Sequence, residues 1–175
     1  LDGSLESRRE YVYDTDGNQI EDNSYRSDGS IQRQSKYDTD GNRVAYTTYR
    51  LDGSLESRRE YVYDTAGNKI EDNSYRSDGS IESQDKYDTD RNLVEYTTYD
   101  LDGSLESRTE YVYDTAGNRI ETNDYRSDGS IESKSKYAYE FSDWGNRVEY
   151  TTYYLDASLE SRREYVYDTD GNKIE

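Results

Sequence analysis

The sequence contains no cysteine, histidine, methionine or proline, and it has one phenylalanine and one tryptophan among 175 residues. The absence of cysteine excludes disulfide bridges and zinc–thiolate sites. Without histidine or cysteine, nucleophilic or acid–base catalysis would need a serine–lysine pair or two carboxylates. Paired carboxylates recur along the whole chain instead of marking one site. We therefore expect that the protein is not an enzyme.

Aliphatic residues are also scarce. Hydrophobic residues make up 30% of the chain, and 22 residues are tyrosine. No apolar run is long enough to cross a bilayer, so we expect no membrane insertion. Acidic residues outnumber basic residues by 40 to 22, and the net charge of −18 argues against nucleic acid as a partner. Tyrosine, valine, isoleucine and threonine between evenly spaced turns nevertheless predict a folded β protein.

Repetition dominates what is present. Residues 1–50 and 51–100 differ at nine positions, namely 16, 19, 32, 33, 35, 41, 43, 45 and 50. A third unit covers residues 101–154 and includes a four-residue insertion, and a partial unit covers residues 155–175. Repeats of this length are typical of arrays in which each unit packs on its neighbours. The sequence thus predicts one repeat array over residues 1–175.

A shorter period lies inside each unit. Asp-Gly, or a replacement for it, recurs at spacings of 12 or 14 residues. Asp-Gly between alternating runs is typical of a hairpin with a three-residue loop, in which glycine takes a positive φ. The predicted turn glycines of the first period are Gly17, Gly29, Gly41 and Gly53.

These turns predict an all-β fold, an antiparallel β-hairpin meander with about four strands per 50-residue repeat, each of about nine or ten residues. An open or solenoid-like sheet is favoured by the near-uniform turn spacing. Four strands per unit also fit a propeller blade, so ribbon, solenoid and propeller remain alternatives.

The turns also predict the pairing of the strands. With a loop at 27–29, Tyr25 faces Ile31, and Tyr49 faces Leu55 by the same count. Aromatic–aliphatic pairs of this kind contribute about 0.2–1 kcal/mol each. The predicted ladder comprises Tyr13, Tyr25, Ile31, Tyr37, Tyr49, Leu55, Tyr63, Tyr75 and Tyr99.

One strand type does not alternate cleanly. Val44 and Tyr49 are five residues apart, so they fall on opposite faces of a regular strand. Either the strand carries a bulge, for example near Thr47-Thr48, or both faces of the sheet are partly apolar.

Three positions break the turn pattern. Arg91 and Ala157 replace turn glycines, at about 1 kcal/mol each if the backbone conformation is kept. The third is the insertion within residues 137–146, which we expect to lengthen one loop. Its aromatic residues, Tyr139, Phe141 and Trp144, form a candidate contact site. Neutral drift in a tolerant turn is the alternative interpretation.

The run Asp14-Thr15-Asp16-Gly17-Asn18 is superficially similar to the start of a calcium loop. An EF-hand needs glycine at loop position 6 and glutamate at position 12, whereas here glycine is fourth and Tyr25 is twelfth. Asp and Asn are also ordinary turn residues. Calcium remains the one candidate cofactor, and no other is expected.

The motif Tyr-x-Tyr-Asp-x-x-Gly-Asn occurs at residues 11–18, 61–68, 111–118 and 165–172, and in weaker form at 37–42. It resembles the tyrosine-aspartate repeat of the Rhs/YD family. That resemblance implies long β-hairpin sheets that spiral into hollow shells, on bacterial surface and toxin proteins and on some animal adhesion proteins. The alternating Tyr-Arg-Ser-Asp-Gly-Ser unit departs from the family pattern.

Two functions follow as hypotheses. The first is a structural segment of a bacterial extracellular or cell-surface protein, acting as a stalk, filament or shell wall within a longer chain. The second is a carbohydrate-binding or adhesive module that uses rows of tyrosine and the loop around Trp144, with glycans as partners. Unpaired edge strands predict self-association through the sheet edges or neighbouring repeats.

Overall fold

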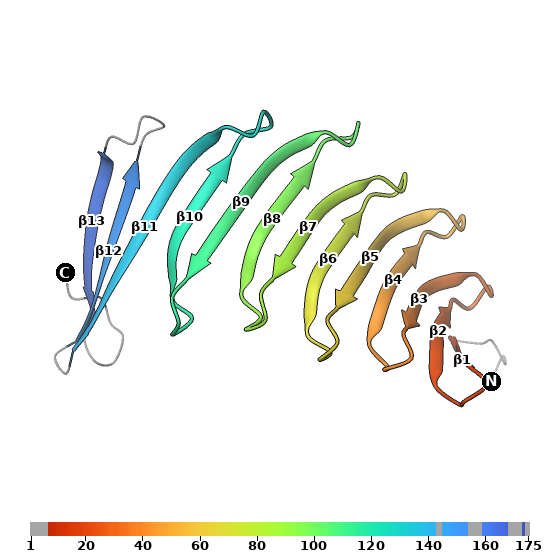
Figure 1. Ribbon diagram of the computed structural model, residues 1–175. Coiled ribbons are helices and arrows are strands. Elements are labelled where there is room, and N and C mark those ends of the chain that lie inside the picture. Colours follow the sequence, from red (N-terminus) through yellow and green to blue (C-terminus); the bar gives the residue numbers. More distant parts are fainter. Residues whose placement is uncertain (1–6, 143–144, 154–158, 168–172, 174–175) are drawn as a thin grey trace.

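The chain forms one antiparallel sheet (Figure 1). The computed structural model describes residues 7–142, 145–153, 159–167 and 173. Within this part, thirteen strands are paired in chain order. They are β1 (Arg8–Tyr13), β2 (Gln19–Tyr25), β3 (Ile31–Tyr37), β4 (Arg43–Tyr49), β5 (Leu55–Tyr63), β6 (Lys69–Tyr75), β7 (Ile81–Tyr87), β8 (Leu93–Tyr99), β9 (Leu105–Tyr113), β10 (Arg119–Tyr125), β11 (Ile131–Ser142), β12 (Gly145–Tyr153) and β13 (Leu159–Tyr167).

This arrangement confirms the predicted hairpin meander with about four strands per repeat. Each strand pairs with the strand before it and the strand after it, and β4 pairs with β5 across the boundary between the first two units. Figure 1 shows a single open layer, with no other element over either face. The continuous pairing excludes a propeller, in which each unit would form a separate blade. Within the described residues, no helix is long and apolar enough to span a membrane.

The turns have the predicted chemistry but take more of the chain than expected. At the turn after β2, the Arg26 amide donates to the carbonyl of Ser30, and the Gly29 amide donates to the carbonyl of Arg26. Gly29 has a φ of +84°. Because residues 26 and 30 close the turn, five residues separate the strands, and β1–β10 contain six to nine residues instead of the predicted nine or ten.

A bulge explains the strand that did not alternate. Lys36 pairs with Ala45 and Tyr37 pairs with Arg43, which leaves Val44 as an extra residue in β4. The bulge alternative is therefore correct, but the bulge lies at 44 and not at 47–48. Similar register shifts occur beside the turns of most hairpins in the sheet. A bulge beside a turn increases the local twist of the strands.

The insertion extends two strands, so the prediction of a longer loop was wrong. Strand β11 has 12 residues, and its pairing with β12 runs without a shift from Lys134–Tyr153 to Ser142–Gly145. Tyr139 lies opposite Val148, and residue 141 lies opposite residue 146. Aromatic residues alternating with small or polar ones favour strand, which explains the extension.

Polar residues occupy the positions that a hydrophobic core would fill. No hydrophobic side chain is buried among the described residues. The buried residues are Asn23, Ser35, Thr47, Asp72, Asn73, Thr97, Thr122, Asn123, Ser135 and Thr151. They lie within the strands, away from the turns. A single layer buries little apolar area, so the backbone ladder and polar side-chain contacts hold the sheet.

Candidate functional site

The two ends of the sheet differ chemically. Turns alternate along the chain, so one end gathers those that close with asparagine, here called the Asn end (14–18, 38–42, 64–68, 88–92 and 114–118). The other end, the Ser end, gathers those that close with serine (26–30, 50–54, 76–80, 100–104 and 126–130). A ligand approaching either end would meet one turn type repeated across the sheet.

At the Asn end, each turn is closed by a carboxylate. Asp14 Oδ1 accepts hydrogen bonds from the amides of Asp16 (2.9 Å) and Asn18 (2.8 Å), and its Oδ2 accepts one from Asn18 Nδ2 (3.0 Å). The Asn18 side chain and amide hold the pKa of Asp14 below its ordinary value. The carboxylate is therefore occupied within its own turn. Calcium binding at these turns stays a prediction, and the described residues include no group of three acidic side chains placed to hold a metal.

At the Ser end, an aspartate also closes the turn, but its hydrogen bonds go to the residue two positions later. Asp28 Oδ1 accepts hydrogen bonds from the Ser30 amide (2.8 Å) and the Ser30 hydroxyl (2.7 Å). The hydroxyl and amide of Ser30 lower the pKa of Asp28. Exposed leucines, Leu51 and Leu101, occupy alternate turns at this end.

Arginines at the Ser end join one hairpin to the next. The Arg26 guanidinium donates to the carbonyl of Ile31 in its own hairpin (2.8 Å) and to the carbonyl of Tyr49 in the following one. Arg76 makes the same pair of contacts, with Ile81 (2.6 Å) and Tyr99. These arginines therefore connect neighbouring turns independently of the strand ladder.

Tyrosines do the same at the Asn end. The Tyr63 hydroxyl donates to the carbonyl of Arg43 (3.0 Å), and the Tyr113 hydroxyl donates to the carbonyl of Leu93 (2.9 Å). Each link spans twenty residues of sequence and joins the last residue of one strand to the first residue of the strand before it, β5 to β4 and β9 to β8. Contacts at both ends thus repeat with the period of the sequence.

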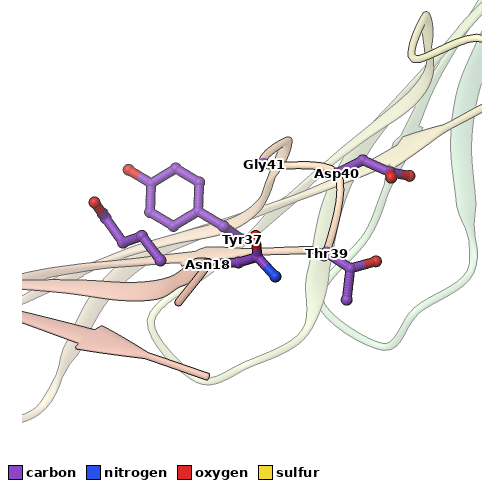
Figure 2. A pocket seen from close by; sticks show the side chains of 6 residues that line it. Asn18, Tyr37, Thr39, Asp40 and Gly41 are labelled. Atoms are coloured by element: carbon purple, nitrogen blue, oxygen red, sulfur yellow. The ribbon is translucent and has the colours of Figure 1, made fainter. Parts of the chain in front are cut away.

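A shallow cavity lies between two neighbouring turns at the Asn end. It measures about 320 Å³ and is lined by Asn18, Tyr37 and the turn residues Thr39, Asp40 and Gly41, together with Gln19. Figure 2 shows these side chains around the opening. None of them forms a nucleophile–base pair.

The two faces of the sheet carry different side chains. The face with Asn73, called the Asn73 face, repeats a three-residue cluster. Arg58 lies 4.9 Å from the centroid of the Tyr75 ring, and the Tyr75 hydroxyl donates to Glu60 Oε2 (2.8 Å). Equivalent clusters occur at Arg8, Glu10 and Tyr25 and at Arg108, Glu110 and Tyr125.

The opposite face, called the Asp72 face, alternates tyrosine with cations. Arg43 lies 5.2 Å from the ring centroid of Tyr46 and 5.4 Å from that of Tyr61. Lys69 Nζ lies 5.6 Å from the Tyr61 centroid and 4.7 Å from the Tyr87 centroid. Such cation–π contacts contribute about 0.5–1 kcal/mol at exposed sites.

The structure refines the predicted tyrosine ladder. Every predicted tyrosine is the last residue of a strand and lies opposite the first residue of the next strand. At the Ser end the partners are aliphatic: Tyr25–Ile31, Tyr49–Leu55, Tyr75–Ile81 and Tyr99–Leu105. At the Asn end they are polar: Tyr13–Gln19, Tyr37–Arg43 and Tyr63–Lys69. Tyrosine–aliphatic pairing therefore holds at one end of the sheet only.

The other predicted residues are placed as follows. Gly17, Gly29, Gly41 and Gly53 have φ between +81° and +89°, and Arg91 keeps a φ of +69° at the equivalent turn position. Of the candidate contact site, Tyr139 and Phe141 lie in β11. Trp144 and Ala157 lie outside the described residues.

Sequence reasoning missed the links between hairpins and the arginine–tyrosine contacts. The sequence does contain part of the signal for these contacts, because the arginines recur at fixed positions of the repeat. Arg26 and Arg76 occupy the same position of their units, and so do Arg8, Arg58 and Arg108. Their partners could not be found from sequence, because the bulges decide which side chains share a face.

No protein-family model and no curated protein matches the sequence. Among solved structures, the chain is similar to a porin-like protein from Bacteroides uniformis, with 12% identity and a TM-score of 0.39 over 93% of this chain and 59% of that one. A TcdB2–TccC3–Cdc42 structure matches at 13% identity and a TM-score of 0.21, over 95% of this chain and 14% of that one. Scores this low support no inference, so membership of the YD repeat family stays a prediction.

Proposed function

We propose that the chain is a structural repeat segment of a bacterial extracellular or cell-surface protein, serving as a stalk, filament or shell wall and without catalytic activity. The observation that supports this function is the sheet itself. Thirteen described strands lie side by side in chain order, and every contact between elements joins consecutive strands. Such an array can be lengthened by whole units without rearranging a core.

The hairpin links give this array its mechanical character. At the Ser end, Arg26 and Arg76 donate hydrogen bonds to the following hairpin, and at the Asn end, Tyr63 and Tyr113 donate hydrogen bonds to the preceding strand. Neighbouring hairpins are therefore connected at both ends of the strands as well as along them. The acidic surface, the lack of cysteine and the resemblance to the YD motif are compatible with an extracellular location.

Changing the number of units tests the proposal. Deleting residues 51–100 removes four strands and should shorten the sheet by about 19 Å, at about 4.8 Å per strand. Duplicating these residues should lengthen it equally. Small-angle scattering measures the dimension, and circular dichroism checks that strand content scales with length. An unchanged maximum dimension, or loss of the strand signal on deletion, would contradict an extensible array.

We further propose that copies associate through the sheet edge formed by β1. All six residues of this strand are exposed, and β5, which has the same sequence at these positions, pairs along its equivalent edge with β4. No other described strand pairs with this edge of β1, so the backbone groups that β5 uses there can pair with a strand of a second copy. Association should appear in light scattering as the protein concentration is raised.

Two matched valine substitutions test whether the β1 edge is responsible for association. Val12 lies in β1 and is 42% exposed, and its counterpart Val62 lies inside the sheet in β5 and is 43% exposed. Val12→Lys places a charge on the β1 strand and should reduce association, whereas Val62→Lys should leave it unchanged. A strictly monomeric protein at all concentrations, or equal effects of the two substitutions, would overturn this part of the proposal.

A further inference from the structure

We infer that the Asp72 face of the first repeat contains a binding site for an acidic saccharide, a sugar that bears carboxylate or sulfate groups. A cavity of about 250 Å³ opens on this face across β1 to β4. Its lining includes Arg9, Arg33 and Arg43, with Tyr37 and Tyr46 and one carboxylate, Asp22. Three arginines thus surround one opening in a chain whose net charge is −18.

Two of the three arginines have no carboxylate partner. Arg9 is paired with Asp22, at 3.2 Å between the guanidinium and Oδ2. Among the described residues, Arg33 makes no ion pair or side-chain hydrogen bond, and Arg43 lies over the rings of Tyr46 and Tyr61 without an ion pair. Arg33 and Arg43 are both exposed. Their donors are therefore free to bind an incoming anion.

The strand register brings these side chains to one face. Ser24 pairs with Arg9 on one side and with Arg33 on the other, so the two arginines stand two strands apart, about 10 Å. Arg43 lies opposite Tyr37 at the Asn-end side of the same opening. No continuous segment of sequence shows this grouping.

Comparison of the repeats supports a dedicated site. The first two units differ at nine positions, and three of these, 33, 35 and 43, line this one cavity. The second unit has Ser83, Asp85 and Leu93 in their places, which removes two positive charges and adds a negative one. The third unit has Thr109 and Ser133 where the first has Arg9 and Arg33. Only the first of these three units combines all three arginines.

The chemistry of the cavity indicates the class of ligand. The planar guanidinium group of arginine binds carboxylate and sulfate through two parallel hydrogen bonds. Tyrosine offers a flat ring face, with a hydroxyl that hydrogen-bonds to polar groups. Arg43 and Tyr46 also line an adjoining cavity of about 450 Å³ that includes Arg59 and Tyr61, so the opening has room for more than one sugar ring. The overall negative charge disfavours long-range attraction of any polyanion, nucleic acid included, so the ligand we assign is a short one held by the cavity alone.

Titration calorimetry of the full chain with a galacturonic acid trisaccharide tests the inference. We expect one binding site, weakened by added salt, and no binding of the neutral galactose trisaccharide. The double variant R33S/R43L introduces the residues that the second repeat already has, so it should fold normally by circular dichroism. We expect its affinity to fall at least tenfold.

The reciprocal variant provides an independent gain of function. S83R/D85S/L93R rebuilds the cavity of the first repeat in the second, where Arg59 and Tyr96 already correspond to Arg9 and Tyr46. We expect the stoichiometry to rise from one site to two. No binding to the unmodified chain, or equal affinity in R33S/R43L, would overturn the site. Equal affinity for inorganic sulfate, or tighter binding of oligothymidylate, would overturn its assignment to a saccharide.

Discussion

The first and second repeats are nearly identical in sequence but differ in charge at the same place on the Asp72 face. In the first repeat, Asp22 lies opposite Ser35 and is paired with Arg9. In the second, Asp72 lies opposite Asp85, and two carboxylates meet on neighbouring strands. The backbone pairing is the same in both. This fold therefore accepts a change of charge that a packed hydrophobic core would not accept.

The second repeat compensates for its extra carboxylate. Position 19 is glutamine in the first repeat and lysine, Lys69, in the second. Lys69 Nζ lies 2.9 Å from Asp72 Oδ2, and Asp72 is only 6% exposed. Burial and the neighbouring Asp72 nevertheless raise the pKa of Asp85 above its ordinary value. Substitutions at distant sequence positions therefore act here as one electrostatic unit.

The largest effect that we expect is a loss of stability in acid, and it is common to both repeats. Hydrogen bonds from Asn18 and Ser30 lower the pKa of Asp14 and Asp28, and the same pattern recurs at the later turns. A carboxyl whose folded-state pKa is lowered adds stability above its unfolded pKa, near 3.8, and loses it as the pH falls through the folded value. We therefore expect the melting temperature to fall steeply below about pH 4.

Thermal unfolding followed by circular dichroism between neutral pH and about pH 3 checks this prediction. Asp64→Ala removes one closing carboxylate and should reduce the loss on acidification. Asp16→Ala is the matched control, because Ala66 already occupies the equivalent position in the second repeat. A melting temperature that is independent of pH would show that the turn carboxylates do not stabilise the folded state.

Lys69→Gln should break the compensation within the second repeat. The substitution restores the residue of the first repeat but removes the ammonium group that contacts Asp72, and it leaves Asp72 and Asp85 facing each other with Arg59 as the remaining cation nearby. We expect a loss of about 2 kcal/mol in the free energy of unfolding, as for a charged hydrogen bond whose partner stays buried. Chemical denaturation measures it. In the background of Asp85→Ser the same change should cost less, and equal costs would mean that the two sites are not coupled.

Gly41 and Arg91 allow a second exchange between the repeats. Gly41 has a φ of +83°, and an arginine there should cost about 1 kcal/mol from backbone strain. The reciprocal change, Arg91→Gly, should gain less than this amount, because Arg91 also donates to Asn68 Oδ1 at 3.2 and 3.3 Å. The two midpoints of denaturation, compared with that of the unmodified chain, decide the prediction. Equal and opposite changes would show that the Arg91–Asn68 contact contributes nothing.

Sequence reasoning predicted the hairpin meander and the chemistry of the turns, because both follow from local patterns such as Asp-Gly at regular spacing. It did not place the bulge at Val44, which depends on how two strands meet beside a turn. It treated the insertion as a loop, although the alternation through Tyr139 favours strand. The cavity with Arg33 and Arg43 was missed for the same reason as the bulge. Its residues come together only once the register of four strands is known.

The smallest expected effect is the one that tests the comparison most directly. Asp85→Ser gives the second repeat the residue of the first and removes a like charge opposite Asp72, which should stabilise the fold at neutral pH by about 0.5 kcal/mol. The groups around Asp85 include Asp72, Lys69, Tyr87 and Arg59, and Tyr96 lies opposite it on β8. Because the folded-state pKa of Asp85 is raised, its penalty is complete above that pKa and disappears as the pH falls through it. The difference in unfolding free energy between variant and unmodified chain should therefore shrink on acidification. A constant difference at every pH would mean that the charge of Asp85 is not what distinguishes the two repeats.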